Sequence, residues 1–146
     1  SSPTRGVMVG SQTSPNRQID FITIATTGSS QDFGDSTNVG SNAAGACSAT
    51  RMVYGGRLDP VSPIDFLTIA TKGDSINFGD MTVARSSFGS MSDCVRGVFS
   101  GGDGSPAQFS EIDYFNIATT GDAVDFGDLP FDNQQCAGCS NGHGGL

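Results

Sequence analysis

Short apolar runs recur along the chain three times in the same order. In each copy, isoleucine and aromatic residues are interleaved with polar ones and then followed by a turn. The three copies, IDFITIATTGSSQDFGD, IDFLTIATKGDSINFGD and IDYFNIATTGDAVDFGD, begin at residues 19, 64 and 112, so they lie 45 and 48 residues apart. Recurrence at a nearly fixed spacing indicates a chain built from repeated structural units.

Two further elements accompany every copy. The preceding elements are RGVMVGS from Arg5, RMVYGGR from Arg51 and RGVFSGG from Arg96. The following elements are AGACS ending at Ser48, MSDCV ending at Val95 and AGCS ending at Ser140. We therefore divide a single repeat domain, residues 1–146, into repeats 5–50, 51–95 and 96–146.

Each repeat predicts four short strands. The arginine-led element predicts a strand that stops at a glycine, which tolerates a positive φ. The next strand is apolar on both faces, with Ile19 and Phe21 on one face and Ile22 and Ile24 on the other. Such a strand is covered on both sides in the folded protein. The stopping glycines are Gly10, Gly56 and Gly101.

A hairpin turn and two more strands complete the unit. Thr-Thr-Gly or Thr-Lys-Gly at 26–28, 71–73 and 119–121 predicts the turn. A short strand then carries a phenylalanine and ends at Gly-Asp, and the small-residue element supplies the fourth strand. The phenylalanines are Phe33, Phe78 and Phe126.

Four short antiparallel strands in every 45–48 residues predict an all-β fold made of propeller-like blades. A β-solenoid is the competing repeat fold, although its coils are shorter and its strands parallel. Propellers usually hold four to eight blades, so three form a partial ring. A second chain or further blades of a longer parent chain would complete the ring, whereas open head-to-tail assembly would build a fibre.

The order of the elements resembles kelch repeats. Gly101-Gly102 stands where that family has its double glycine, and Gly55-Gly56 is a near match. Tyr114 and Phe126 stand where the family has its tyrosine and tryptophan, whereas this chain has no tryptophan at all. The amino-acid sequence of the third repeat also resembles repeats in structural proteins of marine bacteriophages. The resemblance implies a virion-surface or other extracellular location.

Composition and charge restrict the partners. The formal net charge is −8 and the 7 basic residues are scattered, which argues against nucleic-acid binding. No apolar run approaches the ~18 residues that a membrane-spanning helix needs. Gly is frequent, with 21 residues, whereas charged residues make up 15%. This composition favours strands and turns over long helices.

The cysteines predict no cofactor or metal site. Cys47, Cys94 and Cys139 are expected at equivalent, buried positions of neighbouring strands, too far apart for disulfides. The pair Cys136 and Cys139 has metal-ligand spacing, but with His143 alone it falls short of four zinc ligands. A local disulfide between these two cysteines remains an alternative.

Charged residues also recur in each repeat. We expect the aspartates to form hydrogen bonds at turns and blade edges rather than to bind calcium, because they come singly in each strand or turn. The arginines are expected to bridge neighbouring blades by pairing with those aspartates, with sugar or phosphate binding as the alternative. These recurring positions are Asp20, Asp65, Asp113, Asp35, Asp80, Asp128, Arg5, Arg51 and Arg96.

The sequence predicts a non-enzymatic protein, because it contains no Ser-His-Asp set, phosphate loop or paired acids. Repeated residues indicate structure, whereas a catalytic site breaks repeat symmetry. We expect a structural or adhesion module of a virion, such as a tail fibre, appendage or capsid decoration, or of another extracellular assembly. Its partners are copies of itself or neighbouring structural proteins. The alternatives are a lectin-like propeller that binds cell-surface glycans and an intracellular kelch-like adaptor.

Overall fold

The computed structural model describes residues 4–10, 17–37, 42–56, 62–104 and 107–140. Eleven strands and no helix lie in these ranges. No helix of the described residues is long and apolar enough to cross a membrane. The predicted all-β class is confirmed for this part of the chain.

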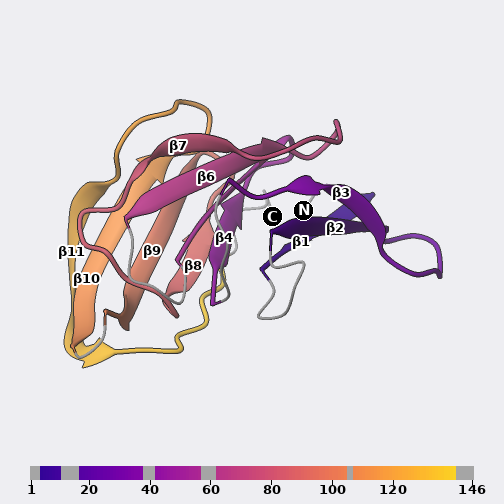
Figure 1. Cartoon of the computed structure of the whole chain (residues 1–146). Coiled ribbons are helices and arrows are strands. Elements are labelled where there is room, and N and C mark those ends of the chain that lie inside the picture. Colours follow the sequence, from indigo (N-terminus) through magenta and orange to yellow (C-terminus); the bar gives the residue numbers. More distant parts are fainter. Residues whose placement is uncertain (1–3, 11–16, 38–41, 57–61, 105–106, 141–146) are drawn as a thin grey trace.

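The strands form three antiparallel sheets, which follow one another along the chain (Figure 1). The first sheet contains β1 (Arg5–Val9), β2 (Gln18–Thr23) and β3 (Gln31–Asp35). The second contains β4 (Ala44–Cys47), β5 (Arg51–Gly55), β6 (Pro63–Thr68) and β7 (Ile76–Asp80). The third contains β8 (Gly89–Ser92), β9 (Arg96–Asp103), β10 (Gln108–Asn116) and β11 (Val124–Asn133).

The first strand of a sheet comes from the preceding sequence repeat. β4 lies in repeat 5–50 but pairs with β5 of the second sheet. In the same way, β8 lies in repeat 51–95 and pairs with β9. The small-residue elements of the first two repeats therefore cross to the next sheet, which ties consecutive repeats together.

A bulge recurs where the last two strands of each sheet pair with each other. Ile19 opposes Gly34 and Asp20 opposes Asp32, so Phe33 lies between two paired positions. The pairing of β6 with β7 leaves Phe78 in the same position, and that of β10 with β11 leaves Phe126 there. An extra residue in a bulge leaves the ladder of its own sheet. Its main-chain groups are thereby free to bond elsewhere.

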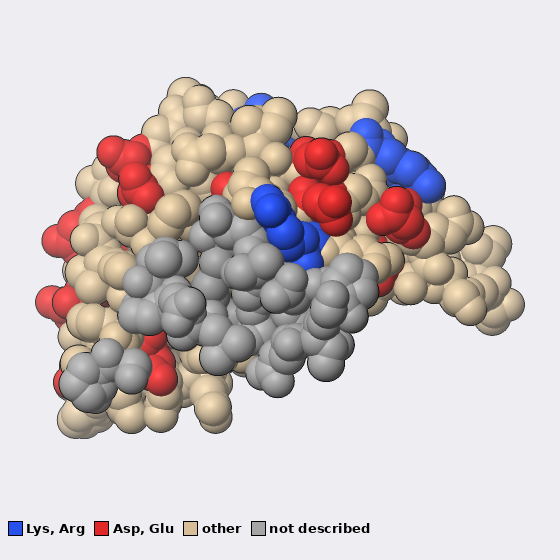
Figure 2. Space-filling model, in the orientation of Figure 1, with Lys and Arg blue, Asp and Glu red and all other residues tan. Residues whose placement is uncertain are grey.

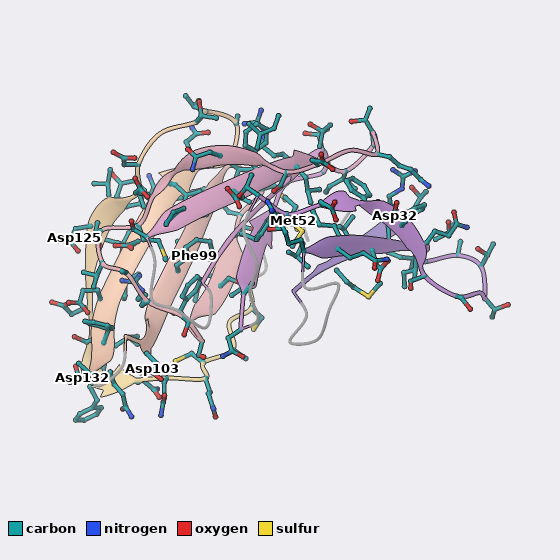
Figure 3. All side chains as sticks on the ribbon, in the orientation of Figure 1. Asp32, Met52, Phe99, Asp103, Asp125 and Asp132 are labelled. Carbon is teal, nitrogen blue, oxygen red and sulfur yellow. The ribbon has the colours of Figure 1, made fainter. Side chains whose placement is uncertain are left out.

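The core fills the spaces between consecutive sheets. Between the first and second sheets lie six buried residues, Ile19, Phe21, Phe33, Tyr54, Leu67 and Ile69. Between the second and third sheets lies a larger cluster that includes Val53, Ile64, Phe78, Phe99, Phe115 and Ile117. Figure 3 shows the Phe99 side chain in the interior, whereas Asp125 and Asp132 lie at the outer edge of the third sheet. Burial of these apolar side chains holds the sheets face to face.

Several sequence expectations need correction. The first sheet has three strands in the described residues, not the predicted four. The three sheets form no closed ring there, and none was expected from three repeats alone. Gly10 and Gly56 have positive φ and directly follow β1 and β5, as predicted. Gly101 has a positive φ of 65° but lies inside β9, which runs on to Asp103 through a register shift. β11 likewise continues beyond the Gly-Asp at 127–128 to Asn133.

Candidate assembly interface

The interface between the first and second sheets, here called the first junction, contains a set of main-chain hydrogen bonds. The Gly73 N–H donates to the Phe33 carbonyl and the Ser75 N–H donates to the Asp35 carbonyl, both at 2.9 Å. The Asp74 carboxylate also accepts the Asp35 N–H at 2.9 Å. The turn of one sheet thus bonds the outer strand of the sheet before it, at the bulge.

The second junction, between the second and third sheets, repeats these bonds. Gly121 and Ala123 donate to the carbonyls of Phe78 and Asp80, both at 2.8 Å. The Asp122 carboxylate accepts the Asp80 N–H at 3.0 Å. We call the two main-chain bonds and the carboxylate bond of each interface the junction bonds. Because two of the three use only main-chain groups, they suit any pair of consecutive repeats.

Glycine at the bulge allows this approach. A Cβ added to Gly34 would lie 2.4 Å from the Gly73 carbonyl oxygen, and one added to Gly79 would lie 2.2 Å from that of Gly121. No real Cβ contact is that short, so any other residue would force the sheets apart. The equivalent Gly127 of the third sheet would have no described atom within 4 Å of its Cβ.

The repeat arginines of the first two sheets also cross the junctions. Arg5 Nη1 donates to the Ile69 carbonyl at 2.7 Å. Arg51 Nη1 donates to the carbonyls of Ile117 and Ala118 at 3.1 and 2.9 Å. The predicted bridging between neighbouring units is therefore present for Arg5 and Arg51, although these three bonds end on main-chain carbonyls rather than on aspartates.

An aromatic ring of its own sheet supports each repeat arginine. The guanidinium carbons lie 4.3–4.7 Å from the ring centroids, which is within the range of cation–π attraction. The stacked ring limits the orientations of the side chain. The three pairs are Arg5 with Phe21, Arg51 with Phe66 and Arg96 with Tyr114.

The repeat aspartates of the second and third sheets are buried at the junctions. Asp65 and Asp113 are both fully inaccessible to solvent. Asp65 accepts a hydrogen bond from the Thr37 hydroxyl, and Asp113 accepts one from the Thr82 hydroxyl. Asp113 also accepts the Thr82 N–H at 3.3 Å. The threonine in each case belongs to the segment that leaves the preceding sheet, so these carboxylates also join neighbouring sheets.

The second junction contains a buried charged residue, Arg85, and the first repeat has no charged residue at the equivalent position. Arg85 lies in the connection from β7 to β8, is fully buried, and forms a 3.0 Å ion pair with Asp113. Desolvation by burial lowers the pKa of Arg85, and the Asp113 charge partly opposes this shift. Sequence reasoning missed Arg85 because it looked for repetition, and the equivalent position in the first repeat is Gly40.

The four cysteines are free thiols. Cys47 lies in β4, but Cys94 lies in the turn between β8 and β9 with a positive φ of 73°. The structural counterpart of Cys47 is Ser92, whose hydroxyl donates to the Cys47 carbonyl at 2.9 Å. Ser140 donates in turn to the Ser92 carbonyl. Cys47, Cys94 and Cys139 therefore do not occupy equivalent positions, and Cys94 and Cys139 are exposed rather than buried, so the prediction is wrong on both points.

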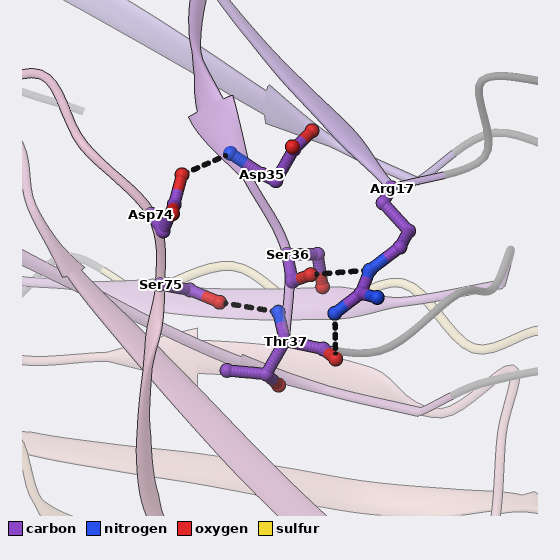
Figure 4. Close-up of a pocket in the computed structure, with 6 residues that line it drawn as sticks. All are labelled: Arg17, Asp35, Ser36, Thr37, Asp74 and Ser75. Atoms are coloured by element: carbon purple, nitrogen blue, oxygen red, sulfur yellow. Dashed lines mark hydrogen bonds between the residues drawn. The ribbon is translucent and has the colours of Figure 1, made fainter.

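A polar pocket of about 470 Å³ lies at the first junction (Figure 4). Arg17 donates to the carbonyls of Ser36 and Thr37, and the Thr37 N–H donates to the Ser75 hydroxyl at 2.9 Å. Its polar groups thus bond one another across the junction, which indicates a structural role. No group of three or more His, Cys, Asp or Glu residues in the described ranges is arranged to hold a metal ion. The lining residues are Arg17, Asp35, Ser36, Thr37, Asp74 and Ser75.

The open face of the first sheet exposes apolar side chains that the other sheets bury. Ile24 is 53% exposed, whereas its counterparts Ile69 and Ile117 are each 1% exposed. Met8 and Ile22 are exposed in the same way, at 46% and 38%. The prediction that the strand containing Ile22 and Ile24 is covered on both faces is therefore wrong for the first sheet.

The opposite end of the stack shows the complementary difference. Phe126 of the third sheet is 56% exposed, whereas Phe33 and Phe78 are 2% and 3% exposed. Beside Phe126 lies a hollow of about 240 Å³ that is also lined by Arg96 and Val98. We call this surface the third-sheet end face, and the surface of Met8, Ile22 and Ile24 the first-sheet end face.

On the face shown in Figure 2, charge does not mark a separate site. Figure 2 shows acidic side chains spread along the face and edge of the molecule, with few basic ones among them. No protein-family model and no curated protein matches this chain. The two end faces expose apolar side chains whose counterparts are buried at the junctions, so these faces are the candidate functional surfaces.

Proposed function

We propose that this chain is a non-enzymatic structural module, a kelch-like propeller segment that works by assembling with further sheets of the same kind. The observation that carries the proposal is the recurrence of the junction bonds at both interfaces. Each end face presents one half of that interface. A chain with both halves has the surfaces needed for head-to-tail assembly.

The connectivity of the sheets supports the propeller part of the proposal. Each of the last two sheets has four antiparallel strands in sequence order, and the first strand of each is supplied by the preceding repeat. The sheets also pack face to face through apolar side chains. These are the features of propeller blades. The three described sheets then form part of a ring.

The resemblance to bacteriophage structural repeats supports a place in a virion or another extracellular assembly. Structural proteins of such particles act through contacts with neighbours and need no catalytic centre. An acidic, glycine-rich chain with a net charge of −8 suits a particle surface in contact with solvent. The lectin and adaptor alternatives remain predictions, and no contact described above favours either.

Light scattering on the purified chain, combined with electron microscopy, tests the proposal. We expect particles larger than the 14.9 kDa chain, seen as rings or fibres. A Phe126→Asp variant should disperse them, because it places a charge on the third-sheet end face. Phe131→Asp is the matched control, since Phe131 is 79% exposed and lies after the recurring segment that ends at Asp128. A single species of one-chain mass over a wide concentration range would contradict the proposal.

A further inference from the structure

The segment after β11 lies in the position of a first strand. The Gln135 N–H donates to the Ser87 carbonyl at 2.7 Å, just as the Ser87 N–H donates to the Asn42 carbonyl at 3.2 Å. Asn42, Ser87 and Gln135 also share a positive φ, at 63°, 54° and 56°. Residues 136–140 therefore lie beside β8 in the same way that β8 lies beside β4.

This segment has no sheet of its own within the described residues. β4 pairs with β5, and β8 pairs with β9. Residues 136–140 are in no strand of the described chain. β1 has the opposite property, since it pairs with β2 alone among the described strands, whereas β5 and β9 pair on both sides. Within its described residues the chain thus carries both a sheet edge at β1 that pairs with no further strand and a segment of the type that covers such an edge.

We propose that residues 137–140 of one copy of this chain pair with β1 of a second copy and become the fourth strand of its first sheet. This inference rests on the proposed function and names the contact by which assembly occurs. An extended segment that joins an open sheet edge is a common mode of association. By the register of β4 on β5, the pairs are Ala137 with Val9, Gly138 with Met8, Cys139 with Val7 and Ser140 with Gly6.

The end faces fit this arrangement. Counted from the repeat arginine and the repeat isoleucine, Met8, Ile22 and Ile24 correspond to Tyr54, Leu67 and Ile69. The latter three pack against Phe21 and Phe33 at the first junction, where all are buried. On the third-sheet end face, Tyr114 and Phe126 occupy the corresponding positions, with ring centroids 6.0 Å apart. Docking therefore places three exposed apolar side chains of one copy over two aromatic rings of the other.

The polar groups of the junction correspond as well. Arg96 stacks on Tyr114, and among the described residues its guanidinium has no carbonyl acceptor of the kind that Arg5 and Arg51 have. The second copy supplies one at Ile24, the counterpart of Ile69 and Ile117. The carbonyls of Phe126 and Asp128 likewise meet the N–H groups of Gly28 and Ser30. The bulge at Gly127 has the space that this approach requires.

Several bonds of the internal junctions have no counterpart in this contact. Ser29 stands where Asp74 and Asp122 accept an N–H of the preceding sheet, and serine has no carboxylate.

The threonine bonds of the internal junctions are also missing. Pro130 stands where Thr37 and Thr82 donate across the junction, and proline has neither a hydroxyl group nor an N–H. Asp20, the corresponding aspartate, already accepts a bond from its own sheet, because Gln18 Nε2 donates to it at 3.0 Å. The carboxylate therefore keeps a donor without the partner copy.

Disulfide trapping tests the register. In a background that keeps Cys139 but carries Cys47→Ser, Cys94→Ser and Cys136→Ala, Val7→Cys places two thiols at opposed positions of neighbouring strands. Directly opposed residues are within disulfide reach. Mild oxidation should then convert most of the chain to linked dimers or ladders in non-reducing gels. Met8→Cys in the same background is the matched control and should link at least fivefold less, because its side chain points to the other face.

The outcomes separate the contact from the function. If the Val7→Cys protein assembles by light scattering but forms no intermolecular disulfide, this contact is wrong and the proposed function stands. If neither variant nor the native chain assembles, both are wrong. A disulfide within one chain, seen as a monomer with altered mobility, also contradicts the contact. Arg96→Ala gives a second test, since it should weaken assembly at least tenfold without lowering the unfolding midpoint of the monomer.

Discussion

The two junctions share a main-chain arrangement and differ in what fills the space beside it. In both, a hairpin turn donates two N–H groups to the bulged outer strand of the sheet before it. Both also place a glycine where the two backbones approach most closely. The main chain therefore sets the geometry of docking in the same way at each interface.

The side chains beside this arrangement are not the same. At the second junction Phe78, Phe115, Phe99 and Phe88 form a continuous run with ring centroids 4.6–5.5 Å apart. Within the described residues, a buried ion pair is found at that junction alone, between Arg85 and Asp113. At the first junction the buried Tyr54 hydroxyl donates to Ser36 at 3.0 Å.

The comparison separates what is general in a junction from what is particular. The two main-chain junction bonds need little beyond glycine and an extended backbone, so they are available to every pair of repeats. The aromatic run and the ion pair determine how strongly one particular pair is held. Four experiments test this separation, and we give them in order of decreasing effect.

Arg85→Met should produce the largest effect. It leaves Asp113 buried without its cationic partner, which costs about 3–5 kcal/mol when one member of a buried pair is removed. The free energy of unfolding in urea measures the loss. The double variant Arg85→Met with Asp113→Asn should recover at least half of it, because the remaining carboxamide carries no charge. A single variant with a loss below about 1 kcal/mol would mean that the pair does not hold the second junction.

Gly79→Ala should weaken the second junction, and Gly34→Ala should weaken the first by a similar amount. Each added methyl group meets a carbonyl oxygen of the next sheet, and overpacking of this kind costs about 1–3 kcal/mol. Thermal unfolding compares the variants. Gly121→Ala is the matched control, since its Cβ would meet no described atom within 4 Å. Equal losses for Gly79→Ala and the control would show that backbone strain, not sheet approach, explains the effect.

Arg51→Ala should cost about 1–2 kcal/mol of stability, which is the size of a hydrogen bond made by a charged group together with its ring contact. Arg51 donates to the next sheet within the same chain, whereas Arg96 has its acceptor in a second copy under our proposal. Arg96→Ala should therefore leave the stability of the monomer nearly unchanged. Calorimetry at a concentration where the chain is monomeric measures both. Equal losses would remove the distinction between internal and end positions.

Asp93 should give a small, pH-dependent effect in the β8–β9 turn. Hydrogen bonds from the N–H groups of Arg96 and Val95 lower its pKa in the folded protein. The resulting stability is present above the unfolded value of about 3.9 and is lost as the pH falls through the folded pKa. In the β4–β5 turn the uncharged Ser48 hydroxyl accepts the corresponding N–H groups at 3.3 and 3.1 Å.

The variant Asp93→Ser makes the two turns alike. When the pH is changed from 7 to 3, the unfolding midpoint of this variant should fall less than the unfolding midpoint of the native chain. Circular dichroism melts at the two pH values measure this difference. An identical acid-induced loss in both proteins would show that Asp93 does not contribute to the pH dependence.

Repetition in the sequence predicted most of the strands, because alternating apolar residues and glycine-containing turns are local signals. The hairpins at 26–28, 71–73 and 119–121 do connect β2 with β3, β6 with β7, and β10 with β11. The cysteine alignment failed because position in β4 and β8 is set by the strand register. That register places Ser92, and not Cys94, opposite Gly97, as Cys47 lies opposite Met52.

The contacts between sheets were less accessible from the sequence. Strand patterns show which residues are buried, but they do not show which main-chain groups meet across an interface. The bulge at Phe33 and Phe78 depends on pairing between strands, so no single strand predicts it. The sequence did contain one signal for Arg85, because it is one of only 7 basic residues and stands in a run of small residues.

The crossing of β4 and β8 into the next sheet also bears on how chains of this type change in length. The boundary of a sequence repeat falls inside a sheet, and the register of β4 on β5 corresponds to that of β8 on β9. A duplication or deletion of one whole repeat therefore leaves every sheet after the first with four compatible strands, wherever in the repeat the cut occurs. The number of sheets in a chain is thus free to vary by recombination between repeats, without redesign of any single interface.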